Sequence, residues 1–120
     1  MPQYVYPIIP GTLVVIDGDT VRADIDLGFN ISRRIAVRLF GINSPEKNTA
    51  AGKEAAKFLA ALTNGGLSPC RLETIKDRDD KYGGRFLGIV YKEGESPSFN
   101  DQLVLAGHAK RWDGKGVKPT

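Results

Sequence analysis

The prediction of the fold begins from the segment Val37-Arg38-Leu39-Phe40-Gly41-Ile42-Asn43-Ser44-Pro45-Glu46. Its first part alternates, with Val37 and Leu39 on one face and Arg38 opposite, which is typical of a half-buried strand. Gly41 ends this strand, because glycine permits the backbone angles that a tight turn requires. The loop that follows carries oxygen-bearing side chains at Asn43, Ser44 and Glu46. A fixed cation followed by oxygen ligands and a carboxylate can hold a hard metal ion beside a phosphate.

Two further strands precede this segment, and all three are expected to form an antiparallel meander. The β-branched run from Thr12 to Ile16 predicts the first strand. Residues 20–26 alternate between apolar and charged side chains and predict the second, while residues 31–40 predict the third. The turn Asp17-Gly18-Asp19 joins the first two strands and places two carboxylates together, with glycine supplying the freedom that the turn needs.

Beyond Glu46 the apolar side chains change to helical spacing. Residues 49–63 predict an amphipathic helix, and Asn64-Gly65-Gly66 ends it. Residues 70–76 and 85–91 predict a fourth and a fifth strand, separated by a charged loop over residues 77–84. Ser98, with Asp101 three residues later, resembles a capping box that opens a short helix ending before Gly107.

Five strands with a helix between the third and the fourth follow the element order of an OB-fold barrel. We therefore predict a mainly β protein with helices (α+β), a five-stranded OB-fold barrel with two to three packed helices. Residues 1–120 are predicted to form a single domain. Residues 1–11 are expected to be an extended N-terminal arm and residues 113–120 a flexible tail. An SH3-like barrel or a small α+β sandwich would give a similar order of elements.

The amino-acid composition limits the catalytic groups and metal ligands that the chain can use. The chain has one His and one Cys, which excludes an internal disulfide, a zinc site of several His or Cys ligands and a two-histidine ribonuclease site. Hydrolysis would therefore depend on carboxylates, arginines and a hard cation. The net charge of +3 suits a polyanionic partner. The apolar runs are too short for a membrane span and the N-terminus lacks a signal-peptide pattern, so we expect a cytoplasmic protein, with a secreted mature form left open.

Taken together, the motifs resemble those of the thermonuclease, or staphylococcal-nuclease-like, family. The matching segments, in the family's order, are Val15-Ile16-Asp17-Gly18-Asp19-Thr20-Val21, Val37-Arg38-Leu39 with Asn43-Ser44-Pro45-Glu46, Asp80-Lys81-Tyr82-Gly83-Gly84-Arg85, and Asn100-Asp101-Gln102-Leu103-Val104 with Gly107 and Ala109-Lys110. The resemblance implies an OB-fold barrel and calcium-dependent cleavage of DNA and RNA phosphodiester bonds, with little sequence specificity and with 3′-phosphate ends as products.

The resemblance also implies a role for individual residues. The metal site would consist of Asp19, Asn43, the backbone carbonyl of Ser44 and, as a nearby acidic support, Asp17. The catalytic residues would be the phosphate-binding pair Arg38 and Arg85, and Glu46, which activates or orients the attacking water. The substrate phosphate would lie beside Lys81 and Tyr82. We expect one Ca²⁺ ion as the cofactor, nucleic acid as the substrate and partner, and a monomer.

The sequence departs from the family pattern at several positions. Asn43 stands where the family usually has a metal-binding Asp, so we expect weaker ion binding and lower activity at limiting calcium. Ser44 replaces a common Thr, and an additional glycine precedes Arg85. Trp112, where some members carry a pocket tyrosine, is expected to pack in the protein rather than to stack on a base.

The alternative function is a noncatalytic nucleic-acid-binding OB-fold module that has lost its metal-dependent activity. Asn43 favours this alternative, whereas the joint presence of Arg38, Glu46 and Arg85 opposes it, because binding alone does not require that trio. A protein-interaction domain is a third reading. The carboxylates of Asp77, Asp79 and Asp80 are interpreted as a solvated loop rather than as a second metal site.

Overall fold

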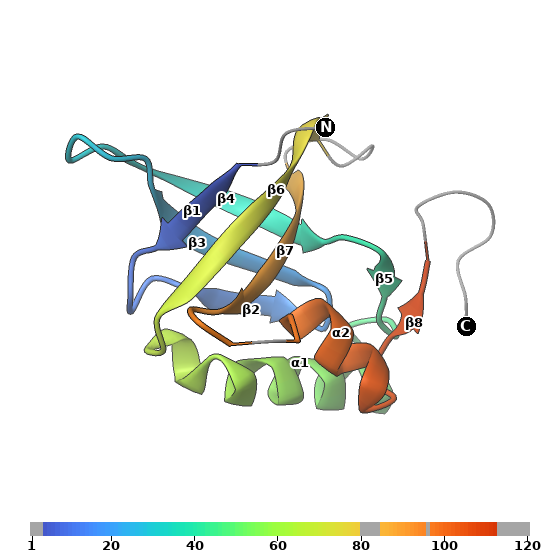
Figure 1. The fold of residues 1–120 in the computed structure, drawn as a ribbon. Helices are drawn as coiled ribbons and strands as arrows, with labels where there is room; N and C mark the ends of the chain where they lie inside the picture. The colour runs from blue at the N-terminus through green and yellow to red at the C-terminus, as the bar shows by residue number, and fades with distance from the viewer. Residues whose placement is uncertain (1–3, 80–84, 96, 113–120) are drawn as a thin grey trace.

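Five strands of the chain close into a barrel. The computed structural model describes residues 4–79, 85–95 and 97–112, with the backbone alone for residues 75–79 and 85. The neighbours around the barrel are β1 (Val5–Ile8), β6 (Cys70–Asp79), β7 (Arg85–Lys92), β4 (Ser32–Leu39) and β3 (Thr20–Asp26), and β3 meets β1 again (Figure 1). This closed barrel with its packed helices confirms the predicted α+β OB-fold.

The meander predicted for the first half of the chain is confirmed. β2 (Val14–Asp17) pairs antiparallel with β3, and β3 pairs antiparallel with β4 over its whole length. β4 then pairs parallel with β7, with Ala36 beside Arg85 and Arg38 beside Leu87. This last pairing joins the two halves of the chain.

β1 is the barrel strand that the sequence analysis did not assign. It lies in the segment expected to be an extended arm, where Pro7 weakens the strand pattern. β1 nevertheless pairs antiparallel with β6, from Val5 beside Glu73 to Ile8 beside Cys70, and Ile8 also meets Ile25 of β3. The segment therefore supplies part of the barrel wall.

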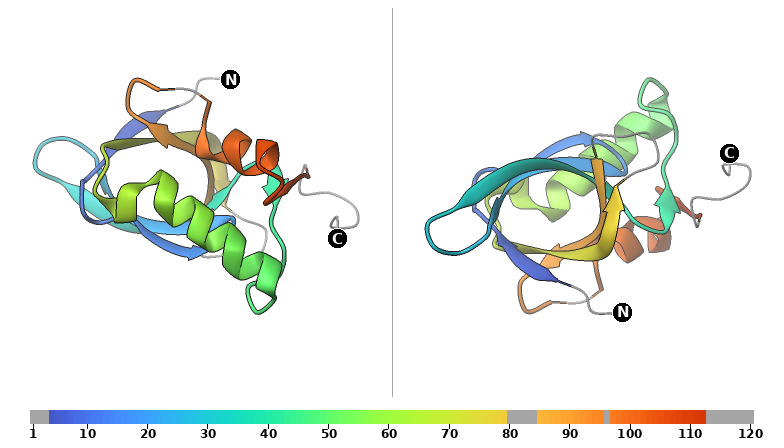
Figure 2. Two further views of the ribbon diagram at one scale, coloured as in Figure 1. Left: turned by 90° about the horizontal axis from the view of Figure 1, so that it is seen from below. Right: turned by 90° about the horizontal axis from the view of Figure 1, so that it is seen from above.

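Two helices cover the barrel as predicted. α1 (Ala50–Leu62) begins after Thr49, whose side chain accepts a hydrogen bond from the Gly52 N–H, and it is followed by the 3₁₀ turn η1 (Asn64–Gly66). α2 (Phe99–Leu105) begins after Ser98, which caps the Asp101 N–H. Figure 2 shows α1 lying across one end of the barrel with α2 beside it. No described helix is both long and apolar enough to cross a membrane.

The core fills the barrel with the alternating apolar residues of its strands, sealed by the helices. Its members are buried in a single cluster that includes Val21, Ile25, Val37, Leu39, Leu59, Leu72, Val90 and Leu103. Cys70 lies in this cluster, and burial raises the pKa of its thiol to about 11. It therefore packs as a small apolar side chain.

Two details differ from the prediction. β6 extends to Asp79 rather than ending at Lys76, because pairing resumes between Asp79 and Phe86 after an irregularity. Two short strands, β5 (Ile42–Asn43) and β8 (Lys110–Arg111), form an additional antiparallel pair at one side of the barrel (Figure 1). Two-residue strands have no detectable periodicity, so the sequence did not predict them. The predicted tail, residues 113–120, lies outside the described residues.

Candidate active site

Two carboxylates meet at the turn between β2 and β3. Asp17 ends β2, and its Oδ1 accepts a hydrogen bond of 3.0 Å from the Asp19 N–H. Asp19 directly precedes β3, and its Oδ1 accepts a 3.1 Å bond from the Thr20 hydroxyl. The pairing of β2 with β3 shifts register between Val15 and Asp17, so the backbone at this turn departs from the regular ladder. Gly18 is required between them, since a Cβ there would lie 2.7 Å from the Ala55 Cβ of α1.

Burial and the contact between the two carboxyl groups give Asp17 and Asp19 different pKa values. Burial, followed by the hydrogen bond with Asp19 and its negative charge, raises the pKa of Asp17 from 3.8 to about 6. Burial also acts to raise the pKa of Asp19, but hydrogen bonds from the Asp17 carboxyl and the Ser44 N–H, with the charge of Arg38, hold this pKa below its usual value. Asp17 is therefore the group of the pair that gains a proton first as the pH falls.

Arg38 neutralises this anion from the neighbouring strand. Strand register places Arg38 beside Thr20, and its Nη2 lies 3.5 Å from Asp19 Oδ2. The same guanidinium donates to the Ile42 carbonyl at 3.3 Å and to the Asn43 Oδ1 at 3.2 Å. Arg38 and Asp19 are both buried, so each charge depends on the other for compensation.

The loop after β4 contributes a second contact to the Asp19 carboxylate. The Ser44 N–H donates a 3.1 Å hydrogen bond to Asp19 Oδ2, the oxygen that also faces Arg38. Asn43 lies in β5, beside Lys110 of β8. Five of the residues that the sequence analysis selected therefore meet at one corner of the barrel: Asp17, Asp19, Arg38, Asn43 and Ser44.

Of the remaining selected residues, the structure describes Glu46 in full and Arg85 by its backbone alone. Glu46 is exposed, and its backbone carbonyl accepts hydrogen bonds from the Thr49 N–H and hydroxyl at the start of α1. Arg85 is the first residue of β7 and pairs with Ala36 of β4, whereas Arg38 of β4 pairs with Leu87. The side chain of Arg85 is outside the described part. Lys81 and Tyr82 also lie outside the described residues.

Trp112 is a member of the site that the sequence analysis did not assign to it. The Arg38 Cζ lies 5.2 Å from the centroid of the Trp112 ring, and the backbone N–H of Trp112 donates to the Gly41 carbonyl at 2.9 Å. The expected packing role is confirmed, but the packing partner is the arginine of the site. No local signal revealed this contact, because it joins two residues that are far apart in the sequence.

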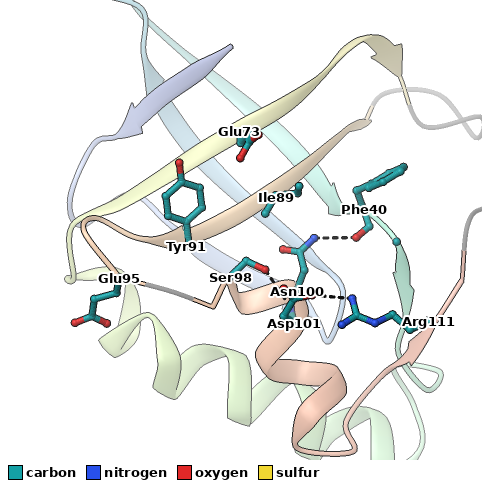
Figure 3. A pocket seen from close by; sticks show the side chains of 10 residues that line it. Phe40, Glu73, Ile89, Tyr91, Glu95, Ser98, Asn100, Asp101 and Arg111 are labelled. Atoms are coloured by element: carbon teal, nitrogen blue, oxygen red, sulfur yellow. Dashed lines mark hydrogen bonds and ion pairs between the residues drawn. The ribbon is translucent and has the colours of Figure 1, made fainter. Parts of the chain in front are cut away.

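A separate hollow lies behind the site, between β7 and α2. Its volume is about 530 Å³, and its lining includes Tyr91, Glu73 and the ion pair of Asp101 with Arg111 (Figure 3). Asn100 lies at its edge, where its Nδ2 donates to the carbonyls of Phe40 and Gly88. None of the candidate site residues selected from the sequence lines this hollow. The hydrogen bonds of Asn100 hold α2 against Phe40, just after β4, and against Gly88 of β7.

The donor atoms at the corner suit a hard cation. They are the carboxylates of Asp17 and Asp19 and the amide oxygen of Asn43, and oxygen ligands are those that Ca²⁺ prefers. The raised pKa of Asp17 reflects its burial and then the neighbouring Asp19 carboxylate, and a divalent cation relieves the repulsion between two such acids. Within the described ranges, however, no three acidic, histidine or cysteine side chains converge as a metal-binding group. The corner thus offers two carboxylates and neutral oxygens.

Comparison with known protein families gives a match that includes part of this corner. A family model described as staphylococcal nuclease homologue matches residues 36–118, more than half of the chain. The match includes Arg38, Asn43, Ser44, Glu46 and Arg85, whereas the turn of Asp17 and Asp19 precedes it. No curated relative matches the chain.

Proposed function

The chain belongs to the staphylococcal nuclease homologue family, and we propose that it is a metal-dependent nuclease that hydrolyses phosphodiester bonds of DNA and RNA. We further propose that cleavage uses one Ca²⁺-type ion, has little sequence specificity and leaves 3′-phosphate ends. The observation that carries this proposal is the buried contact of Arg38 with Asp19, beside Asn43 and Ser44. A guanidinium that can bind phosphate and a carboxylate that can bind a metal ion are thereby held together near the end of β4.

Arg38 would bind the nonbridging oxygens of the scissile phosphate. A guanidinium is planar and can bind two oxygens at once, and this interaction strengthens as negative charge develops on them. Its contact with Asp19 and with the Ile42 carbonyl restricts its rotation before substrate arrives. Restricting the side chain in advance reduces the reorganisation required during the reaction.

Asp19 would be the principal ligand of the ion, supported by Asp17, Asn43 and the Ser44 carbonyl. When bound there, such an ion supplies positive charge to the phosphate and helps to position it. The Ser44 N–H and the Thr20 hydroxyl hold the Asp19 carboxylate in place. These two bonds do the orienting that ligand-supporting groups provide in metal sites.

Glu46, Arg85, Lys81 and Tyr82 would complete the reaction. Glu46 would orient the attacking water, and its exposure on the loop before α1 leaves its carboxylate accessible to solvent. The start of β7 beside Ala36 supports Arg85 as the second phosphate ligand, because it brings the two arginine positions onto adjacent strands. Lys81 and Tyr82 would contact the substrate phosphate.

One observation favours the alternative of a noncatalytic nucleic-acid-binding module. The Asn43 amide oxygen, which stands in place of a charged ligand, accepts a hydrogen bond from Arg38. A neutral oxygen in this position contributes no charge to ion binding, and ligand charge tunes calcium affinity. A domain with this substitution can retain phosphate contacts without the ion.

A gel assay separates these functions. Plasmid and single-stranded DNA are incubated with the protein in calcium and then with a chelator. The nuclease proposal predicts cleavage in calcium only, with products whose 3′ ends accept labelling only after phosphatase treatment. A shifted band without cleavage in calcium would establish the binding module instead.

Asn43→Asp tests the metal assignment directly. The added carboxylate should lower the calcium concentration for half-maximal cleavage by about tenfold, because it adds charge to the ligand set. Asn48→Asp is the matched control, since it adds the same charge at an exposed position of the neighbouring loop. An equal response of both variants would remove Asn43 from the ligand set.

A further inference from the structure

We propose that Trp112 is a positioning residue, whose indole holds the Arg38 guanidinium in the orientation that meets the phosphate. This inference rests on the proposed nuclease function. The Arg38 Cζ lies 5.2 Å from the centroid of the Trp112 ring, and both residues are buried. An arginine over an indole is attracted by the negative face of the ring, and the attraction is strongest where water is excluded.

The polar contacts of Arg38 restrain the edge of its guanidinium, and the indole restrains its face. The guanidinium nitrogens face the Ile42 carbonyl, the Asn43 amide oxygen and the Asp19 carboxylate. Such bonds lie near the plane of the guanidinium and position its edge, whereas an aromatic ring restrains the face of that plane. Trp112 therefore limits the tilt of the group, which determines where its N–H bonds point.

Trp112 is itself held by contacts that do not involve Arg38. The pairing of β8 with β5 places Arg111 beside Ile42, and the backbone N–H of Trp112 continues this ladder to the Gly41 carbonyl at 2.9 Å. Arg111 also forms an ion pair with Asp101 of α2, at 2.7 Å (Figure 3). The end of the described chain is thus anchored to both the β4–β5 connection and α2.

The same strand provides an internal comparison. Arg33, at the opposite end of β4, lies 5.4 Å from the Phe86 ring centroid, but it is exposed. Similar geometry therefore occurs twice on β4, once in solvent and once in the buried corner. The buried instance alone adjoins the carboxylates of the site, so its loss should affect catalysis while loss of the other should not.

Steady-state kinetics on a single-stranded oligonucleotide in saturating calcium tests the proposal. Trp112→Leu should lower kcat by about tenfold, while KM changes by less than about twofold, because Arg38 remains but is less well oriented. Trp112→Phe retains an aromatic face and should restore kcat to within about threefold of the wild type. Arg33→Ala should leave both constants unchanged. A loss confined to KM would identify a base-stacking role, and failure of Phe to rescue would identify packing alone; either result overturns the proposal.

Fluorescence provides a readout that needs no turnover. Trp112 is the single tryptophan of the chain, so its emission reports directly on this contact. Arg38→Lys should shift the emission, and inorganic phosphate should change the emission of the wild type but not that of Arg38→Leu. Arg33→Ala should match the wild type. Unchanged emission in Arg38→Lys would overturn the contact, whereas shifted emission in a protein that cleaves nothing would refute the nuclease function and leave the contact standing.

Discussion

Two ion pairs at opposite ends of the β3–β4 hairpin differ in distance and in burial, and the longer pair is the more buried one. Near the β3–β4 hairpin, Arg34 Nε lies 2.8 Å from Asp24 Oδ1, with 68% and 23% of the two side chains exposed. At the other end, Arg38 Nη2 lies 3.5 Å from Asp19 Oδ2, with only 8% and 11% exposed. Water screens the attraction in the shorter, exposed pair. The two charges of the longer pair are buried and have lost their hydration, so each requires the other for compensation. Burial, rather than distance, distinguishes the pair that is proposed to act in the site.

The cover over each end explains the difference. Arg38 is enclosed by β5, by Trp112 and by the loop at Ser44. The hairpin at residues 27–31 instead projects away from the barrel, on the side opposite to β5 and β8 (Figure 1), and Phe29 at its tip is 95% exposed. A continuous ribbon of two strands therefore carries a buried site at one end and a solvated turn at the other.

The largest effect should come from removing each arginine in turn. Arg38→Ala leaves the Asp19 carboxylate buried without its partner, and it should lower the free energy of unfolding by about 3 kcal/mol. It should also reduce cleavage by at least about 100-fold, because a phosphate-stabilising donor is lost. Arg34→Ala should change stability by less than about 0.5 kcal/mol. Urea unfolding and initial cleavage rates measure both.

Comparable losses in the two variants would contradict this comparison. Adding Asp19→Asn to Arg38→Ala serves as the control, because it removes the uncompensated charge. The double variant should regain part of the lost stability without regaining cleavage.

Two glycines sharpen the comparison with a smaller effect. A Cβ at Gly18 would lie 2.7 Å from the Ala55 Cβ and 2.8 Å from the Ser44 Cβ, so Gly18→Ala should cost about 2 kcal/mol through overpacking. Gly28 has a φ of +82° and open space around it, so Gly28→Ala should cost only about 1 kcal/mol of backbone strain. Only Gly18→Ala should also impair cleavage. A larger stability loss at Gly28 would show that packing at the site end is not the limiting factor.

The smallest effect concerns pH. The pKa of Asp17 is about 6 in the fold against an ordinary 3.8, so between these values the folded state holds a proton that the unfolded state has released. Stability should therefore fall as pH rises across this interval. Asp17→Asn, which has no proton to lose, should abolish that fall, while Asp24→Asn at the hairpin end should retain it because Asp17 is intact. Urea midpoints without divalent ions, taken between pH 4 and pH 7, measure it; a persistent fall in Asp17→Asn would refute the assignment.

Local patterns predicted the elements on which the site is built. Alternation identified β3 and β4, the spacing of apolar residues identified α1, and the capping pattern at Ser98 identified the start of α2. These features depend on residues within one helix, one turn or one strand. β1 was not assigned, because Pro7 obscures its pattern and its partners are Glu73 and Ile25, far along the chain.

The sequence alone determined that Asp17 and Asp19 share a turn, that Arg38 follows on the third strand of the meander, and that Asn43 and Ser44 follow Arg38 within a few residues. Only the tertiary structure decided that Arg38 is buried against Asp19 and that Trp112 covers it. The physical reason is that periodicity and turn chemistry act between neighbours in the chain. Burial and charge compensation instead depend on which distant segments the closed barrel brings together.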